Sequence, residues 1–182
     1  MDSKLIFPEN KCEKKYLFVD LRDFVDQMDS GDFSFSVFFS SQNKKSLSFP
    51  PFSNISKAEL KAINFPKMNN DEMYFILDIY EFNGRLNSSD NEGSHDKFAV
   101  IHYDSSSMTP GSMKPARGKD FDDKIVVFNP IERSLNRLTV NIRKYGGNII
   151  NMSDIDSSLG SMVDFLNKYP VNFMIEFTCE RY

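Results

Sequence analysis

The sequence predicts an all-β protein in which two antiparallel sheets pack face to face. Phe makes up 18 of the 182 residues while Trp is absent, and aromatic enrichment of this kind favours strands. Most apolar segments alternate apolar with polar residues, which indicates strands with one buried and one exposed face. Strands do not alternate regularly with helices along the chain, so a parallel sheet is not expected.

The first two strands are predicted from their aromatic residues. Residues 16–22 (YLFVDLR) form the first candidate. In residues 32–40 every second position from Phe33 to Phe39 is apolar, and serines with Phe38 fill the positions between. This period of two places a nearly all-aromatic face against the core. It leaves Phe38 on the serine-lined face, as a candidate exposed contact residue.

Two further strands precede the centre of the chain. In residues 57–65 small apolar residues alternate with Lys and Glu, and the same residues would share no face of a helix. Pro66 ends that segment. Residues 73–82 (MYFILDIYEF) form the most strand-like segment of the chain, and the Asn83-Gly84 pair that follows signals a turn.

The remaining strands lie in the second half of the chain. Strands are predicted over residues 97–103, 124–128, 137–143 and 171–179, with a hairpin at Gly146-Gly147 leading into residues 148–152. Between the first two lies a predicted loop over residues 104–123. A loop of that length is uncommon in a compact domain and is usually functional or mobile.

One short helix is predicted near residues 153–168. Apolar residues recur there at helical spacing, after possible caps at Ser153 or Asp156 and before Pro170. About eight antiparallel strands joined by loops of unequal length match a single jelly-roll β-sandwich. We divide the chain into an extended N-terminal arm, residues 1–14, and a jelly-roll domain, residues 15–182.

Composition and charge exclude several classes of protein. The formal charge is −4, and a general nucleic-acid binder needs clustered Lys and Arg instead. We find no secretory signal and no apolar run long enough for a transmembrane segment. Cys12 and Cys179 are most simply two reduced thiols, although both lie next to predicted strands and the sequence leaves open whether they pair.

The sequence offers few residues for metal binding. Only His95 and His102 are present as histidines, and their spacing fits neither a zinc site nor a facial triad. The acidic run at residues 90–96 supplies oxygen ligands without the spacing of a calcium-binding loop, so a solvated loop is the stronger interpretation. We expect no cofactor.

Catalytic constellations are equally sparse. Asp78 and Glu81 are candidate paired carboxylates for glycoside hydrolysis, but a separation of three residues places them on opposite faces of a regular strand. Lys114, Arg117 and Lys119 form a small basic cluster in the predicted loop, which is more often solvated than anion-binding. We expect the protein not to be an enzyme.

Several segments together resemble a known family of viral proteins. The matching segments are 62–66 (AINFP), 72–82 (EMYFILDIYEF), 98–101 (FAVI), 128–130 (FNP) and 135–143 (LNRLTVNIR), followed by Gly146-Gly147. In this order they resemble the single jelly-roll minor capsid or penton proteins of large double-stranded DNA viruses and their satellite viruses. The resemblance covers residues 57–180, and residues 104–123 and 153–170 fall outside its pattern.

The resemblance implies a structural virion protein, either the penton at the fivefold vertex or another minor capsid protein. Its expected partners are other capsid proteins, including the major capsid protein, and further copies of itself in a homopentamer. It would be found in the virion, assembled in the host cytoplasm. The alternatives are a monomeric ligand- or carbohydrate-binding β-sandwich module, and a metal enzyme on a jelly-roll barrel.

The N-terminal arm supplies the other candidate contact residues. Leu5, Ile6 and Phe7 form a lone apolar cluster in a polar segment, which indicates that a partner covers them. Residues 1–15 carry four Lys and three acidic residues, so the arm lacks the charge expected of a genome-binding segment. We therefore expect the arm to contact adjacent subunits, with no direct contact to nucleic acid.

Overall fold

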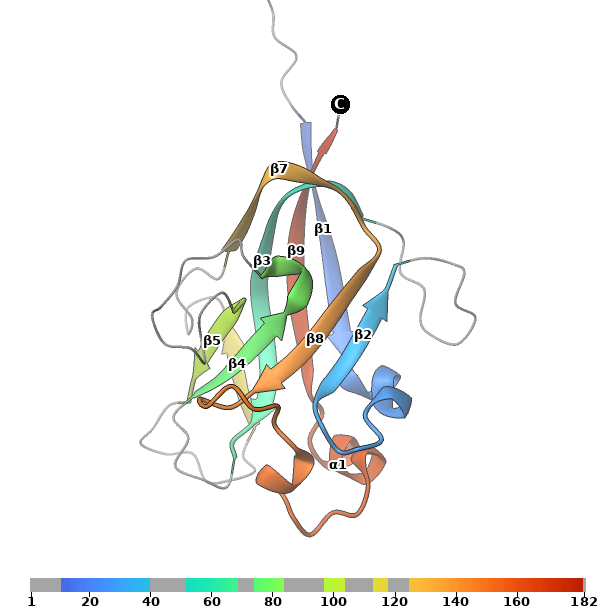
Figure 1. Ribbon diagram of the computed structural model, residues 1–182, viewed down its shortest axis with the longest axis vertical. Coiled ribbons are helices and arrows are strands. Elements are labelled where there is room, and N and C mark those ends of the chain that lie inside the picture. Colours follow the sequence, from blue (N-terminus) through green and yellow to red (C-terminus); the bar gives the residue numbers. More distant parts are fainter. Residues whose placement is uncertain are drawn as a thin grey trace, which may run out of the picture.

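The structure is a computed structural model that describes residues 11–39, 52–68, 74–83, 97–103, 113–117 and 125–181, and these form a two-layer sandwich (Figure 1). The first sheet contains β1 (Lys11–Asp20), β9 (Asn172–Arg181), β3 (Phe52–Pro66) and β6 (Met113–Arg117), in that order, and β7 (Ile125–Leu135) also pairs with β3. The second sheet contains β2 (Ser34–Phe38), β8 (Arg137–Arg143), β4 (Tyr74–Ile79) and β5 (Ala99–His102). Every pair is antiparallel, so the predicted all-β sandwich is confirmed.

The chain passes between the two sheets at most of its connections. β6 pairs with the C-terminal part of β3 and β7 with its N-terminal part, so these two segments share one strand position. When β6 and β7 are counted as one position, each sheet has four strand positions. Eight positions in two layers are the jelly-roll pattern. At one end of the sandwich only Asn136 separates β7, in the first sheet, from β8, in the second (Figure 1).

Phenylalanine rings fill the space between the sheets. The largest fully buried side chains are Phe24, Phe33, Phe39, Phe65, Phe75, Phe82, Phe98, Phe165, Phe173 and Phe177, with Leu17 and Leu21. They pack ring against ring: the Phe177 centroid lies 4.5 Å from that of Phe52 and 6.3 Å from that of Phe82. Because offset and edge-to-face contacts add to area burial, this cluster is the main source of cohesion between the layers.

Short helices close the end of the sandwich opposite the β7–β8 corner. The 3₁₀ helix η1 (Leu21–Gln27) begins at Asp20, whose side chain accepts a hydrogen bond from the Arg22 backbone N–H, and it buries Leu21 and Phe24. The α-helix α1 (Met162–Lys168) begins at Ser161, whose hydroxyl accepts from the Asp164 N–H. Phe165 and Leu166 of α1 are buried in the core.

The helix is shorter than predicted. The segment expected near residues 153–168 is divided into the 3₁₀ turn η3 (Met152–Asp154) and α1. Asn151 caps η3, where the sequence pattern indicated Ser153 or Asp156. Gly160 and the cap Ser161 interrupt the helical spacing, since glycine and an N-cap both favour non-helical backbone.

Three further predictions on element boundaries were wrong. The predicted loop over residues 104–123 contains the strand β6, and β7 continues well past its predicted end at residue 128. β1 begins at Lys11, so residues 11–14 of the predicted arm pair with β9, and residues 1–10 lie outside the described residues. The Gly146-Gly147 turn is present, with Gly147 at a φ of 80° and an isolated bridge between Arg143 and Ile149.

The two cysteines lie on paired strands and remain free thiols. Cys12 pairs with Glu180, and Cys179 pairs with Glu13, so the cysteines are one position apart in register. Successive side chains of a strand point to opposite faces, which separates the two sulfurs across the sheet. Cys12 is exposed and Cys179 is buried in the core, where burial raises the pKa of its thiol.

Replacing Phe177 by Ala tests the role of the aromatic core. Loss of the ring leaves a cavity beside Phe52 and Phe82, and we expect the free energy of unfolding to fall by about 3–5 kcal/mol. Urea denaturation followed by circular dichroism measures this change. The control is Tyr80→Ala, at a side chain that is 67 % exposed, for which we expect a change within about 0.5 kcal/mol. Equal losses in the two variants would contradict the prediction.

Candidate interaction surface

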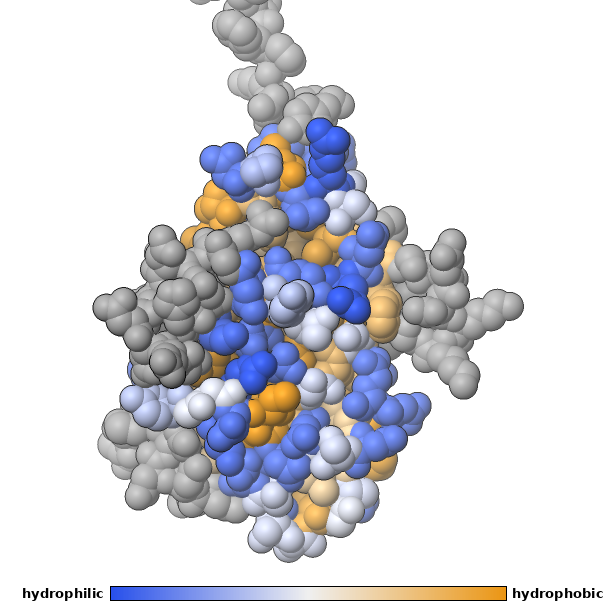
Figure 2. Space-filling model, viewed as in Figure 1, coloured by the Kyte–Doolittle hydropathy of each residue, from blue (hydrophilic) through white to orange (hydrophobic). Residues whose placement is uncertain are grey.

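The outer face of the first sheet carries exposed aromatic side chains. Along β1, Leu17 and Val19 point into the core, whereas Tyr16 and Phe18 expose 58 % and 54 % of their surface. Figure 2 looks onto the other sheet, whose surface is largely hydrophilic with smaller apolar areas. Exposed aromatic residues at alternate positions of one strand mark the outer face of the first sheet as a candidate contact surface.

The strand register places Phe18 in a row of apolar residues. Phe18 pairs with Met174 of β9, and Met174 pairs with Ala62 of β3. Paired residues of neighbouring strands point to the same face, so these three side chains lie side by side across the sheet. Met174 and Ala62 are half-buried. We call Phe18, Met174 and Ala62 the apolar row.

The next row is built around Glu176, a carboxylate that is buried on the outer face of the sheet. Its register partners are Tyr16 of β1 and Glu59 of β3. The Lys14 ammonium lies 3.0 Å from Glu176 Oε1, the Lys61 ammonium lies 3.9 Å from Oε2, and the Tyr16 hydroxyl also hydrogen-bonds to this carboxylate. Tyr16 therefore lies across a paired charge and helps to cover it.

The same contacts decide the ionisation of these groups. Burial by itself raises the pKa of the Glu176 carboxyl, but hydrogen bonds from Tyr16 and Lys14 and the charge of Lys61 outweigh it and hold the pKa below its usual value. The hydrogen bond to Glu176 raises the pKa of both Tyr16 and Lys14. Glu176 is consequently an anion, and the tyrosine a neutral donor, at neutral pH.

Glu59 extends this charge network along β3. Its carboxylate forms ion pairs with the ammonium groups of Lys61 and Lys57, and the Lys57 nitrogen lies 2.8 Å from Oε2. Burial raises the pKa of Glu59, and the two lysines more than compensate, so the net pKa is lowered. Three lysines thus face two glutamates in this cluster, a formal charge of +1 (3 − 2).

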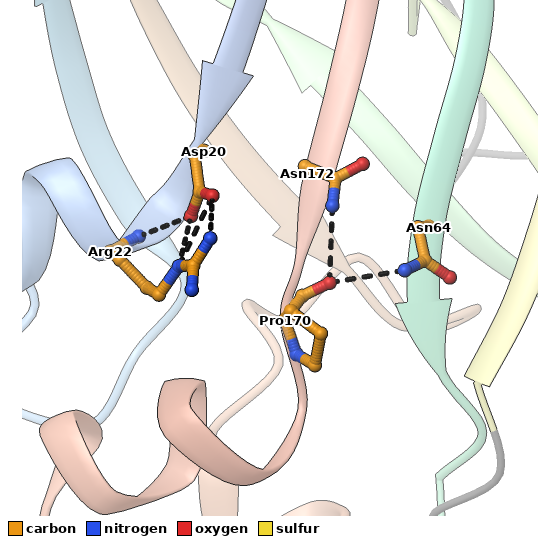
Figure 3. A network of polar contacts seen from close by, with 5 residues as sticks. All are labelled: Asp20, Arg22, Asn64, Pro170 and Asn172. Atoms are coloured by element: carbon orange, nitrogen blue, oxygen red, sulfur yellow. Dashed lines mark hydrogen bonds and ion pairs between the residues drawn. The ribbon is translucent and has the colours of Figure 1, made fainter.

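On the other side of the apolar row the face becomes polar (Figure 3). Asp20, Asn172 and Asn64 lie in register on β1, β9 and β3. Arg22 closes on the Asp20 carboxylate through its Nε, at 2.9 Å, and this contact lowers the pKa of Asp20. Both amides donate to the Pro170 carbonyl, at 3.1 Å from Asn64 and 3.3 Å from Asn172. The apolar row is therefore bordered by side chains that already hydrogen-bond to their own chain.

On the second sheet, the two carboxylates considered for catalysis hold the fold together. Asp78 is buried, and its Oδ2 accepts from Arg143 Nε at 2.7 Å and lies 3.3 Å from the Lys97 ammonium. Glu81 accepts from the backbone N–H of Thr139 at 2.6 Å and from its hydroxyl at 3.0 Å. Both carboxylates therefore have basic or hydrogen-bonding neighbours that tie β4 and η2 (Tyr80–Phe82) to β8.

Only one of the predicted contact residues lies in the described part of the chain. Phe38 is half-buried on β2 and lines a groove of about 550 Å³ together with Glu81, Leu135 and Arg137. Leu5, Ile6 and Phe7 lie outside the described residues.

The residues weighed for metal and anion binding are scattered. His102 lies exposed on β5 with its ring 5.4 Å from that of Tyr74, while His95, Lys119 and the run 90–96 lie outside the described residues. Lys114 and Arg117 belong to β6, of which the structure describes the backbone. Across the described ranges no cluster of three or more His, Cys, Asp or Glu has the geometry of a metal site. Within those same ranges no helix has the length and apolarity of a membrane span.

Comparisons with known proteins give little further information. No protein family matches the chain, and no curated protein matches it. Among the solved structures that resemble it are a mutant VP2 protein of infectious bursal disease virus in derived T=1 particles and the T13 particle of that virus. Their identities are 9 % and 10 %, each with a TM-score of 0.30, over 97 % and 98 % of this chain. The match spans 40 % of each of those chains.

Sequence reasoning missed the outer face of the first sheet. In residues 16–22 both faces of the strand are apolar, so alternation does not tell which side is buried. The charge network was hidden because Lys14, Glu59 and Glu176 are far apart in the chain and meet only through the pairing of β1, β9 and β3. The signal that was present is Glu176 itself, a charged residue between Ile175 and Phe177 in the final strand.

Replacing Glu176 by Gln tests the charge network. A carboxyl whose folded pKa is below its unfolded value stabilises the fold above the unfolded pKa, near 4.5, and loses that contribution as pH falls. We expect E176Q to lower the free energy of unfolding by about 1–3 kcal/mol at pH 7 and by much less at pH 3. Urea denaturation between pH 7 and pH 3 measures both differences. A loss that is equal at the two pH values would contradict the assignment.

Proposed function

We propose that this protein is a structural protein of an icosahedral virion, which joins neighbouring capsid subunits through its jelly roll. The observation that carries the proposal is the apolar row with Tyr16 on an open sheet face whose carboxylates are already paired. Tyr, Phe and Met are enriched at protein interfaces, whereas unpaired charges are depleted from interface cores. The face therefore has the composition of a contact surface.

The charge network supports the same role. Covering an unpaired carboxylate with another protein costs several kcal/mol, because the charge loses its water. Removing one partner of a buried ion pair is also strongly unfavourable, because the other charge is then left buried without a partner. Glu176 is 3 % exposed and already receives two lysines and a tyrosine, so a neighbouring subunit that covers it removes little additional water. The rigid two-layer core beneath keeps the face in one shape before assembly, which lowers the entropic cost of binding.

The finer assignment is the penton, with a minor capsid position as the next choice. A face on one subunit that meets a different surface of the next makes a heterologous contact, and such contacts form a ring when the rotation between successive copies closes. Five copies in a ring would form the fivefold vertex, with the major capsid protein as the surrounding partner. Location in the virion and assembly in the host cytoplasm follow from this role.

The proposal assigns no catalysis and no cofactor to the chain. Asp78 and Glu81, the paired carboxylates considered above, are each engaged by residues of β8. A general acid or nucleophile needs an accessible carboxyl beside an open substrate site. Asp78 is 2 % exposed, which makes it a structural counter-ion for Arg143.

A second candidate function is a monomeric carbohydrate- or ligand-binding module. The observation that favours it is the groove of about 550 Å³, a volume within the usual range for small-ligand sites. Phe38 supplies an aromatic surface there, and Ser134, Asn136 and Arg137 supply polar groups. Saturable binding to a glycan array by a monomeric protein would establish this function in place of the first.

Light scattering of the full chain tests the assembly role. We expect a discrete homo-oligomer, of five copies if the protein is a penton. Phe18→Glu places a charge in the apolar row and should weaken assembly at least about tenfold, which corresponds to 1.4 kcal/mol. The matched control is Tyr80→Glu, at a side chain of similar exposure outside the first sheet, which should assemble normally. A wild-type chain that stays monomeric at high concentration would contradict the pentamer.

A further inference from the structure

A second groove lies at the end of the sandwich that η1 and α1 close. Its volume is about 230 Å³. It is lined by Val25, Asp26, Asp29, Ser30, Gly31, Met152, Gly160, Ser161, Met162 and Val163. We call it the end groove. It takes residues from η1, η3 and α1, which lie together at the lower end in Figure 1.

The lining of the end groove suits an apolar peptide segment with an adjacent positive charge. Val163 exposes 52 % of its surface although it belongs to the helix that packs on the core. Met152 and Met162 are flexible and polarisable, and such side chains adapt to a partner. Asp26 and Asp29 are exposed and add two negative charges. The volume lies below the usual range for small-molecule sites and is close to the size of one or two large side chains.

The chain itself contains a segment of this chemistry. Leu5, Ile6 and Phe7 are consecutive apolar residues, and Lys4 directly precedes them. The segment also contains two acidic residues. Asp2 lies three positions before Leu5 and Glu9 lies two positions after Phe7, so Lys4 is the charged residue directly next to the apolar cluster. An apolar anchor beside a lysine is complementary to an apolar groove beside two aspartates.

The length of the chain excludes binding of this segment to the end groove of its own subunit. β1 runs from Lys11 to Asp20, about 30 Å at the rise of a strand, and η1 with the end groove follows directly after Asp20. Phe7 lies four residues before Lys11 and reaches about 14 Å at most, and Leu5 reaches about 22 Å. The start of β1 lies at the opposite end of the sandwich from η1 and α1 (Figure 1), whose residues line the end groove. A Leu5–Phe7 segment that binds in the end groove must therefore come from a neighbouring copy.

We propose that the end groove of each subunit binds Leu5, Ile6 and Phe7 of a neighbouring copy. Lys4 then lies beside Asp26 and Asp29. Every copy donates one segment and receives one, a heterologous contact that links copies head to tail. This inference rests on the proposed assembly role and names the contact that would join adjacent copies.

Cross-linking distinguishes contact between copies from contact within one copy. The full chain with Cys12→Ser, Phe7→Cys and Val163→Cys is oxidised and run on a non-reducing gel. We expect a ladder of cross-linked oligomers that reduction removes. The matched control replaces Val163→Cys by Tyr145→Cys, at a residue that is also 52 % exposed, and should give no ladder. A cross-linked monomer, or a ladder no stronger than that of the control, would overturn the proposal.

Substitutions in the groove provide an independent measurement. Val163→Glu should weaken assembly at least tenfold in light scattering, with an unchanged thermal midpoint that shows the variant is folded, and Tyr145→Glu should assemble normally. Lys4→Glu and Asp26→Lys should each weaken assembly, and their combination should restore it. If Val163→Glu assembles normally while Phe18→Glu does not, this inference fails and the proposed function stands. If the wild-type chain does not assemble at all, the proposed function fails as well.

Discussion

The structure depends on the layer of phenylalanine rings between the two sheets. Each sheet is amphipathic, and neither could remain folded in water with its inner face exposed. Rings from both sheets contact one another there, as Phe65 of β3 does with Phe75 of β4, with centroids 4.8 Å apart. The helices add to the same layer, since Phe165 of α1 packs 5.4 Å from Phe33. With the core supplied by ring packing, the outer faces need contribute little to cohesion and are free to carry other functions.

The outer face of the first sheet shows what that freedom allows. A carboxylate buried on a sheet surface is unfavourable unless several donors converge on it, and Glu176 has donors from β1 and β3 at once. The same arrangement holds Tyr16 and Lys14 in fixed positions, so the exposed aromatic surface of Tyr16 is preorganised. Charge pairing and aromatic exposure on this face are therefore one feature, and both are lost if the register between β1 and β9 changes.

The sequence was informative wherever alternation was strict. Residues 32–40 and the final strand were predicted correctly, because a buried face demands an apolar residue at every second position. β6 was missed since Met113–Arg117 contains Pro115 and two basic residues, and pairing with β3 makes it a strand all the same. The start of β1 was missed for the same reason, as residues 11–15 are mostly charged and take their structure from β9. The surface site could not be predicted because it is defined by neighbours on other strands.

The order of the strands has a consequence for synthesis of the chain. β9 is synthesised after the other eight described strands, yet it lies between β1 and β3 and pairs with both. Until Asn172–Arg181 emerges, the first sheet lacks its central member, and the inner edges of β1 and β3 stay open. Pairing between β1 and β9 joins segments that are far apart in the chain, so it forms slowly. Until it forms, unpaired strand edges that can aggregate stay exposed. A chain that is shortened before Asn172 is thus the species most prone to aggregate, and the synthesis of β9 is the step that completes the first sheet.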